Sequence, residues 1–303
     1  MISKYKLRKL YERYGYEWFW GVPETDSYMA FIVRYGANDY LELVVLTNRT
    51  EDRTNAEIAK RNLLEEYDFA EVKISQYADY EEAEQALFTA FFKPEEYAKA
   101  LKADVKTYGG VEIKDHNYKL VKGMIKRALE TELCDGENWN VISVMGNKSK
   151  DIPDLYVTAD IAYGLWSEKA VPLVVDLVNN KAAKLFRYIL QDEISRKFRG
   201  IKYECMLEEI KSGRIPVIVT GIEYMFKNHG KMLPDAKENM RALLSSLTNA
   251  VVKKGAKTKL VFVTDNPIYT YLLLHFVEDY FAEDSKIHTE VSTGTFSLRQ
   301  WHI

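Results

Sequence analysis

Four short apolar runs, separated by stretches of helical pattern, occupy the second half of the chain and constrain its fold more than any other feature. The runs are Val141–Met145, Val171–Val178, Val217–Val219 and Leu260–Val263. Each has the length of a buried strand, and the stretches between them are long enough for the crossover helices that parallel strands require. We therefore expect the four runs to pair in one mainly parallel sheet, with helices on both faces.

The N-terminal part of the chain has a different pattern, which predicts a small α+β domain over residues 1–107. Two runs rich in β-branched and aromatic residues, Tyr28–Tyr35 and Tyr40–Leu46, flank a turn of Gly, Ala, Asn and Asp and predict a hairpin. A polar helix is expected at 54–67 and a further strand at 70–76. These elements define the first domain.

The pair Gly109-Gly110 follows this domain and predicts a boundary, because adjacent glycines give a flexible backbone. Beyond it we expect an α/β domain at 111–303. The predicted fold class is thus α/β, with a mostly parallel RecA-like or Rossmann-like sheet preceded by a small α+β domain.

A cluster of aromatic residues, Trp18, Phe19 and Trp20, follows the first helical segment. We expect these rings to pack that helix on the first sheet, in a core that includes Phe31 and Val44. The alternative is that the rings anchor a partner, because exposed tryptophan is typical of interfaces.

Composition narrows the class of protein. Hydrophobic residues make up 47% of the 303 residues, enough for a sizeable buried core. The net charge of -3 provides no global field for nucleic acid, although a local basic patch would still allow a nucleic-acid partner. The two cysteines, Cys134 and Cys205, are too few for a disulfide framework. No run approaches the ~18 apolar residues of a membrane span, and the basic start lacks the apolar segment of a signal peptide. We expect a cytoplasmic protein without a membrane segment.

In strand order and apolar patterning, residues 138–270 resemble a RecA-like P-loop NTPase. The segment that matches the phosphate loop contains Gly146, Asn147, Lys148 and Ser149. That family has two glycines, with Lys and Ser/Thr directly after the second, whereas this chain has one glycine and Asn147 stands between it and the lysine. The resemblance implies that these four residues are the nucleotide-binding segment, in a degenerate form.

The same resemblance assigns roles to residues at the ends of two later strands. Thr220 stands where the family has its Mg²⁺-binding aspartate, and Glu223 follows as the counterpart of the activating glutamate. Asp265 resembles the residue that senses the γ-phosphate. If the protein is an enzyme, the resemblance implies ATP and Mg²⁺ as its cofactors. The alternative interpretation is that these residues only cap strands and helices.

A second resemblance is to the core of PD-(D/E)xK nucleases, in which acidic groups hold Mg²⁺ and a lysine orients the attacking water. It covers residues 120–184 and includes Asp154 and Asp176, of which Asp176 would be the metal ligand. The lysine expected two residues after Asp176 is replaced by Val178. The alternative is that Asp176 only ends a strand.

Our leading hypothesis is a non-catalytic protein-binding or assembly module built on a degenerate nucleotide-binding fold, of the kind used by accessory proteins of phages and mobile elements. It has no cofactor, and we expect a protein partner or self-association. The 21 tyrosines agree with this, since tyrosine is enriched at interfaces. The alternatives are an ATP-dependent NTPase with an unorthodox phosphate loop, and a Mg²⁺-dependent nuclease.

Overall fold

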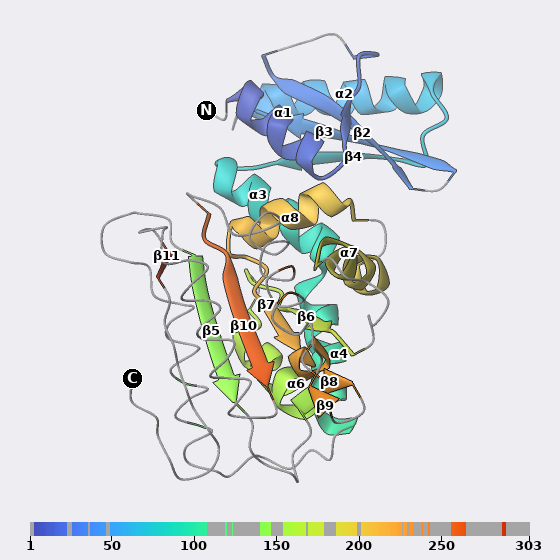
Figure 1. Ribbon diagram of the computed structural model, residues 1–303. Coiled ribbons are helices and arrows are strands. Elements are labelled where there is room, and N and C mark those ends of the chain that lie inside the picture. The colour runs from blue at the N-terminus through green and yellow to red at the C-terminus, as the bar shows by residue number, and fades with distance from the viewer. Residues whose placement is uncertain are drawn as a thin grey trace. The chain divides into compact units, whose positions relative to one another are not determined.

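The structure is a computed structural model. It describes residues 3–22, 26–35, 37–46, 49–107, 140–146, 154–167, 169–178, 186–198, 201–225 and 256–264, short pieces at 227–228, 231–232 and 287–288, and a few isolated positions (Figure 1). The contacts divide the chain into two compact units, residues 1–92 with 198–205 and residues 93–197 with 206–303. Each unit has its own sheet. The glycine pair lies outside the described residues, so the limits 1–107 and 111–303 stay a prediction.

The first unit is built on a four-stranded mixed sheet. Its elements are α1 (Lys4–Arg13), β1 (Glu17–Trp18), β2 (Tyr28–Tyr35), β3 (Asn38–Val45), α2 (Thr50–Glu66), β4 (Glu71–Gln76) and α3 (Tyr80–Phe92). The strand order is β1-β2-β3-β4; the first three strands are antiparallel, and α2 crosses over to place β4 parallel to β3. The predicted hairpin, helix and strand are confirmed. The turn is shorter than expected, because Tyr35 already pairs with Asn38.

Alternation along β3 divides the side chains between the two faces of this sheet. Leu41, Leu43 and Val45 lie in a core cluster with Ala56 and Leu63 of α2. The residues between them belong to the opposite face, because successive strand side chains point in opposite directions. The sheet is therefore packed on both faces.

The expected N-terminal core is confirmed only in part. Phe31 and Val44 are fully buried, and Trp18 is half-buried. Trp20, however, is 74% exposed, so its assignment to the core is wrong. The physical reason is that β1 ends at Trp18 and the last backbone hydrogen bond to β2 comes from Phe19, which donates to the Ala30 oxygen, so Trp20 lies beyond the paired residues.

The second unit is built on a five-stranded sheet. Its elements are α4 (Pro94–Thr107), β5 (Asn140–Gly146), α6 (Asp154–Leu165), β6 (Leu173–Asp176), α7 (Phe186–Lys197), β7 (Val217–Thr220), the 3-10 helix η1 (Ile222–Met225), β10 (Lys259–Thr264) and β11 (Ile287–His288), with a short hairpin of β8 (Lys227–Asn228) and β9 (Lys231–Met232). The strand order is β11-β5-β10-β7-β6, and every pair is parallel. Figure 1 shows β5 and β10 side by side, pointing the same way. The predicted parallel sheet is confirmed.

Helices α4 and α6 pack on this sheet through a cluster of buried apolar residues. The cluster contains Leu101, Tyr156, Val157, Ile161, Ala162, Ile218, Val261 and Val263. Two polar aromatic atoms near it are satisfied by backbone carbonyls: the Tyr97 hydroxyl donates to the Pro172 oxygen at 2.6 Å, and the Trp166 ring nitrogen donates to the Pro94 oxygen at 2.8 Å.

One helix was not anticipated from the sequence. α8 (Tyr203–Lys211) contains the division between the two units, at residues 205 and 206. A helix of nine residues is marginal on propensity alone, and this one is stabilised by its buried side chains Cys205, Met206 and Ile210. The sequence pattern also predicts helices at 118–133, 234–254 and 269–281, and these ranges lie outside the described residues except for isolated helical positions at 119, 123, 238 and 242. In the part of the chain that the structure describes, no helix has the length and apolar character needed to cross a bilayer.

Candidate functional site

The carboxyl edge of the five-stranded sheet contains several of the residues predicted to be functional. Asp176 at the end of β6 pairs in register with Thr220 at the end of β7. Gly146 at the end of β5 pairs with Thr264 at the end of β10. Parallel strands bring their carboxyl ends to the same edge, which is where open α/β sheets bind ligands. The edge therefore places two predicted site residues, Asp176 and Gly146, on one side of the unit.

A tight turn after β7 positions Glu223. Gly221 has a φ of +73°, and a Cβ added there would lie 2.7 Å from Cγ2 of Val178 and 3.1 Å from Oδ1 of Asp176. Only glycine fits this left-handed and crowded position without strain. The chain then enters η1, where Glu223 is half-buried, while Thr220 before the turn is 2% exposed. Glu223 thus lies just past the strand end, where the resemblance places it.

Asp176 performs a structural task at the end of its strand. Its Oδ1 accepts a 2.9 Å hydrogen bond from the backbone nitrogen of Val178. This contact is the one expected if Asp176 ends a strand. Among the described residues, no three His, Cys, Asp or Glu side chains are grouped so that they could hold a metal ion. The assignment of Asp176 as a metal ligand stays a prediction.

The other residues of the predicted nucleotide site belong to the segments after β5 and β10. Asn147, Lys148, Ser149 and Asp265 lie outside the described residues, and of Gly146 only the backbone is described. Their roles stay predictions as well.

A pocket of about 420 Å³ lies beside Asp176, and its charged lining was not foreseen. Glu193 of α7 is 2% exposed and forms an ion pair of 3.3 Å with Arg196. Lys197 is exposed as a residue, yet its ammonium donates a 2.9 Å hydrogen bond to the Val174 oxygen, and desolvation lowers its pKa. The sequence feature that could have predicted this charged lining is Glu193 itself, a glutamate on the apolar side of a helix and next to the buried residue Ile194.

The first unit contains a second candidate site, around a buried carboxylate on β3. Glu42 is 5% exposed. Its Oε1 accepts a hydrogen bond from the Tyr11 hydroxyl at 2.9 Å and another from the Tyr77 hydroxyl at 3.2 Å. The ammonium of Lys73 lies 4.0 Å from the same oxygen. The strand sequence Leu-Glu-Leu-Val-Val was the available signal, because a charge inside a buried run needs partners.

Strand pairing and ring stacking assemble this cluster. Glu42 pairs in register with Phe31 on one side and with Lys73 on the other. The Tyr11 ring of α1 stacks on Phe31, with 4.3 Å between ring centroids. Burial raises the pKa of Tyr11 and Tyr77, and the charge of Glu42 raises both further. Both hydroxyls therefore remain protonated donors at neutral pH.

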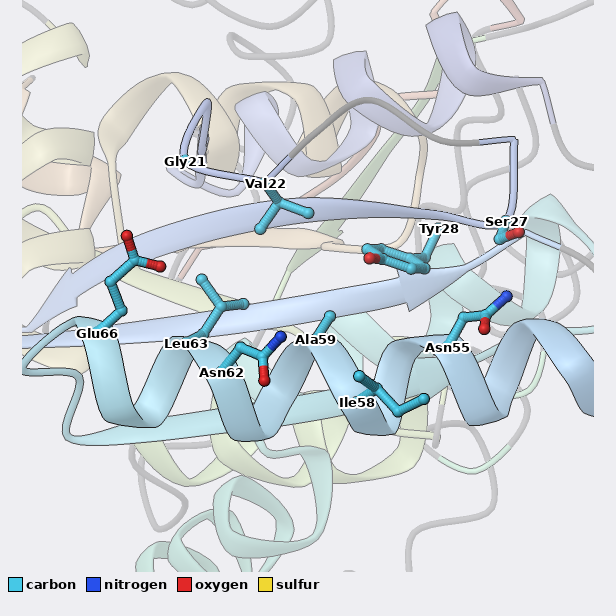
Figure 2. A pocket seen from close by; sticks show the side chains of 10 residues that line it. All are labelled: Gly21, Val22, Ser27, Tyr28, Asn55, Ile58, Ala59, Asn62, Leu63 and Glu66. Carbon is cyan, nitrogen blue, oxygen red and sulfur yellow. The ribbon is translucent and has the colours of Figure 1, made fainter.

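A pocket of about 420 Å³ lies on the other face of the first unit, between α2 and the residues that precede and begin β2 (Figure 2). Its polar lining is uncharged apart from Glu66, and it includes the amides of Asn55 and Asn62. The hydroxyl of Ser27, also in the lining, donates to Oδ1 of Asp52 at 2.5 Å. The pocket therefore combines the hydrogen-bond donors and acceptors of two amides with a lining of apolar side chains.

Comparison with known proteins locates a similarity that covers most of the first unit and continues into the beginning of the second. Residues 6–123 match the family described as NACHT-associated inactive Restriction Endonuclease 2. This stretch contains Glu42 and its tyrosine partners, whereas the nuclease resemblance in the sequence was assigned to residues 120–184. No match was found among curated proteins.

Proposed function

We propose that this chain is a non-catalytic module that binds a protein partner, and that its first unit is a nuclease-like fold without nuclease activity. The observation that carries the proposal is the environment of Glu42. This carboxylate is buried, and one of its oxygens accepts hydrogen bonds from both Tyr11 and Tyr77. A carboxylate held in this way stabilises the fold, while a catalytic carboxylate has to reach a metal ion or substrate.

The strand that carries Glu42 supports the same conclusion. In the nuclease motif, the lysine stands two residues after the acidic residue, and that position here is Val44, which is fully buried. Lys73 approaches Glu42 from the neighbouring strand, so Lys73 is the residue to test as a substitute. The description of the matched family as inactive points in the same direction.

For the second unit we propose a nucleotide-binding type of sheet that has been reused for binding. Support comes from the parallel order β11-β5-β10-β7-β6 and from the presence of only one glycine, Gly146, in the sequence segment that resembles the phosphate loop. A loop with one glycine lacks the conformational freedom that close approach of backbone amides to phosphate requires. The unit would then present its surface to a partner.

The partner that we propose is a NACHT protein, because the matched family is described as NACHT-associated. Self-association is the competing possibility, and the two are separable by mass. The chain alone should show the 35.2 kDa of a single chain over a range of concentrations in light scattering. A mixture with a NACHT protein from the same source should show a heavier complex.

The test of inactivity uses the full chain and several DNA substrates. Supercoiled, linear and single-stranded DNA are incubated with Mg²⁺ or Mn²⁺ and with wild type, Glu42→Gln or Lys73→Ala. We expect all three proteins to leave the DNA intact. Cleavage by wild type that Lys73→Ala loses would overturn the proposal. Lys73 is exposed, so this variant should fold even if Glu42→Gln does not.

The alternative function is ATP binding or hydrolysis by the second unit. It is favoured by the pairing of Gly146 with Thr264 on adjacent strands, whose carboxyl ends lie at the edge where open α/β sheets bind ligands. Steady-state ATP and GTP hydrolysis is measured for wild type, Lys148→Ala and Glu223→Gln, together with thermal stability in ATP and Mg²⁺. Equal, near-zero hydrolysis rates in wild type and both variants would support the non-catalytic module. Hydrolysis that both variants lose would establish the enzyme.

A further inference from the structure

Two tryptophans form an exposed stack on the first unit. The rings of Trp18 and Trp20 lie 4.6 Å apart between centroids, with an interplanar angle of 11°. Trp18 is half-buried, but Trp20 is 74% exposed. Large aromatic surface left in water is unfavourable, and where it persists it marks an interaction site.

The pairing of β1 explains why this stack lies on the α1 side of the sheet. Trp18 is directly opposite Phe31, and opposite residues of an antiparallel pair project from the same face. Phe31 packs on Tyr11 of α1, so Trp18 shares that side. Phe19 projects the other way and contacts the Tyr67 ring at 5.2 Å. The backbone thus fixes which aromatic rings remain outside the core.

A guanidinium from α1 orders the stack. The Cζ of Arg8 lies 4.4 Å from the centroid of the Trp18 ring and 6.0 Å from that of Trp20. Its Nε donates a 2.8 Å hydrogen bond to Glu12, one turn along the helix. Cation–π attraction and this ion pair hold the rings and the guanidinium in a fixed arrangement before any ligand arrives.

The helix next to the stack is strongly basic. Its sequence, KYKLRKLYER, has five Lys or Arg residues and one Glu, which gives 5 − 1 = +4, in a chain whose net charge is -3. Arg8 and Lys9 share the single carboxylate of Glu12. Lys6 and Lys9 are exposed, and Tyr5 between the first two lysines is 71% exposed. Lys4 and Arg13 form ion pairs with Asp26 and Glu84, so the helix and its acidic partners sum to 5 − 3 = +2. The surface that contains the exposed indole therefore retains a net positive charge.

We propose that this surface binds single-stranded nucleic acid. An unpaired base would extend the stack on the outer face of Trp20, and the flanking phosphates would contact Lys6 and Lys9. A parallel pair of rings is continued by a third planar ring, which a single strand presents at every nucleotide. In a duplex the face of each base is covered by the neighbouring bases, so only its phosphates could contact this surface. The inference is independent of whether the nuclease-like unit cleaves DNA.

The test is fluorescence anisotropy of the full chain with a labelled oligonucleotide of about 15 nucleotides, as DNA and as RNA. Trp20→Ala should weaken binding by about five- to hundredfold, the range for loss of one base–aromatic stack. Trp20→Phe should recover much of the affinity, because a phenyl ring still stacks. Lys6→Ala and Lys9→Ala should each reduce the slope of log affinity against log salt by about 0.7.

Tyr188→Ala is the matched control, because this ring is 55% exposed and lies in the other unit. It should bind the oligonucleotide as wild type does. The proposal is overturned if no strand binds at low salt or if Trp20→Ala equals wild type. A duplex that binds as tightly as the strand, or an acidic peptide that displaces it equally well, would also overturn it, the latter in favour of a protein ligand.

Discussion

The Tyr11 hydroxyl donates a 2.9 Å hydrogen bond to Oε1 of Glu42, joining α1 to the central part of β3 across 31 sequence positions. The Tyr77 hydroxyl lies 3.4 Å from that of Tyr11 and donates to the same carboxylate oxygen. A buried charge is tolerated only when hydrogen bonds compensate its desolvation. The first unit therefore depends on these phenols.

Tyr11→Phe should destabilise the first unit by about 1–3 kcal/mol, because it leaves a buried carboxylate short of one donor while the ring can still stack on Phe31. The measurement is the free energy of unfolding in urea. Tyr5→Phe is the control, since Tyr5 is 71% exposed, and should change nothing. Equal stability of the two variants would show that the bond to Glu42 is not structurally important.

Stability should fall as the pH rises above 10. Burial raises the pKa of Tyr77 and Tyr11 above the ordinary value of 10.0, so the fold favours the protonated phenols. The contribution of each protonated phenol to the free energy of unfolding is complete below pH 10.0. Above that pH the tyrosines of the unfolded chain ionise, and the free energy of unfolding falls by about 1.4 kcal/mol per pH unit for each group. Urea unfolding at increasing pH measures this slope. Tyr77→Phe should make the decline shallower, and an unchanged slope would contradict the assignment.

Gly221→Ala should destabilise the second unit by about 1–3 kcal/mol, because its φ of +73° is left-handed and the new Cβ would lie 2.7 Å from Cγ2 of Val178. Thermal unfolding and circular dichroism report the loss. Gly123→Ala is the matched control. Gly123 is helical and an added Cβ meets nothing within 4 Å, so this variant should gain about 0.5–1 kcal/mol. Similar effects of the two changes would refute the steric argument.

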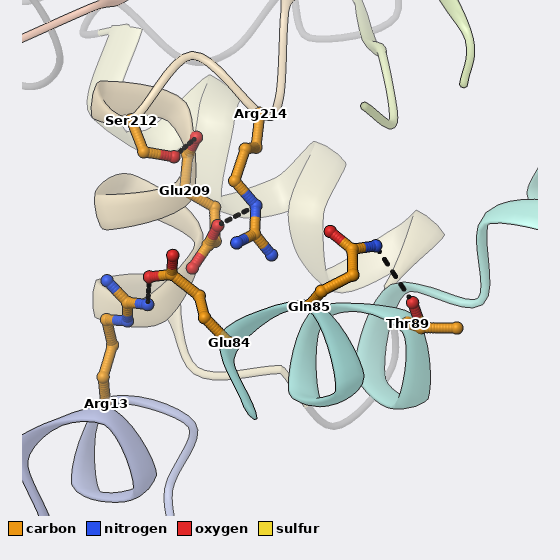
Figure 3. A network of polar contacts seen from close by, with 7 residues as sticks. All are labelled: Arg13, Glu84, Gln85, Thr89, Glu209, Ser212 and Arg214. Carbon is orange, nitrogen blue, oxygen red and sulfur yellow. Dashed lines mark hydrogen bonds and ion pairs between the residues drawn. The ribbon is translucent and has the colours of Figure 1, made fainter. Parts of the chain in front are cut away.

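Arg13 and Glu84 should be coupled by about 1 kcal/mol in a double-mutant cycle. Figure 3 shows the ion pair between these two side chains, which joins α1 to α3. The two atoms lie 2.7 Å apart, and the side chains are 24% and 27% exposed. Partial burial reduces the screening that weakens surface pairs. The cycle uses Arg13→Gln and Glu84→Gln. Lys93 and Glu96, which are 62% and 69% exposed, should show only about 0.3 kcal/mol.

Much of the second unit could be predicted from local pattern. The runs at Val141, Leu173, Val217 and Leu260 became β5, β6, β7 and β10 of one parallel sheet. The reason is that apolar runs of strand length, separated by helices, have few compact arrangements other than a sheet covered by those helices. The turn at Gly221 was not predicted, because its crowding comes from Val178 on the neighbouring strand end.

The sequence by itself determined where the strands and most of the described helices form, because periodicity and turn residues act over a few positions. Only the tertiary structure decided what surrounds each side chain. Trp20 became exposed because β1 ends two residues before it, and Glu42 became satisfied because Tyr11 and Tyr77 reach it through helix packing and strand pairing. Those environments depend on contacts between distant residues, which local pattern does not encode.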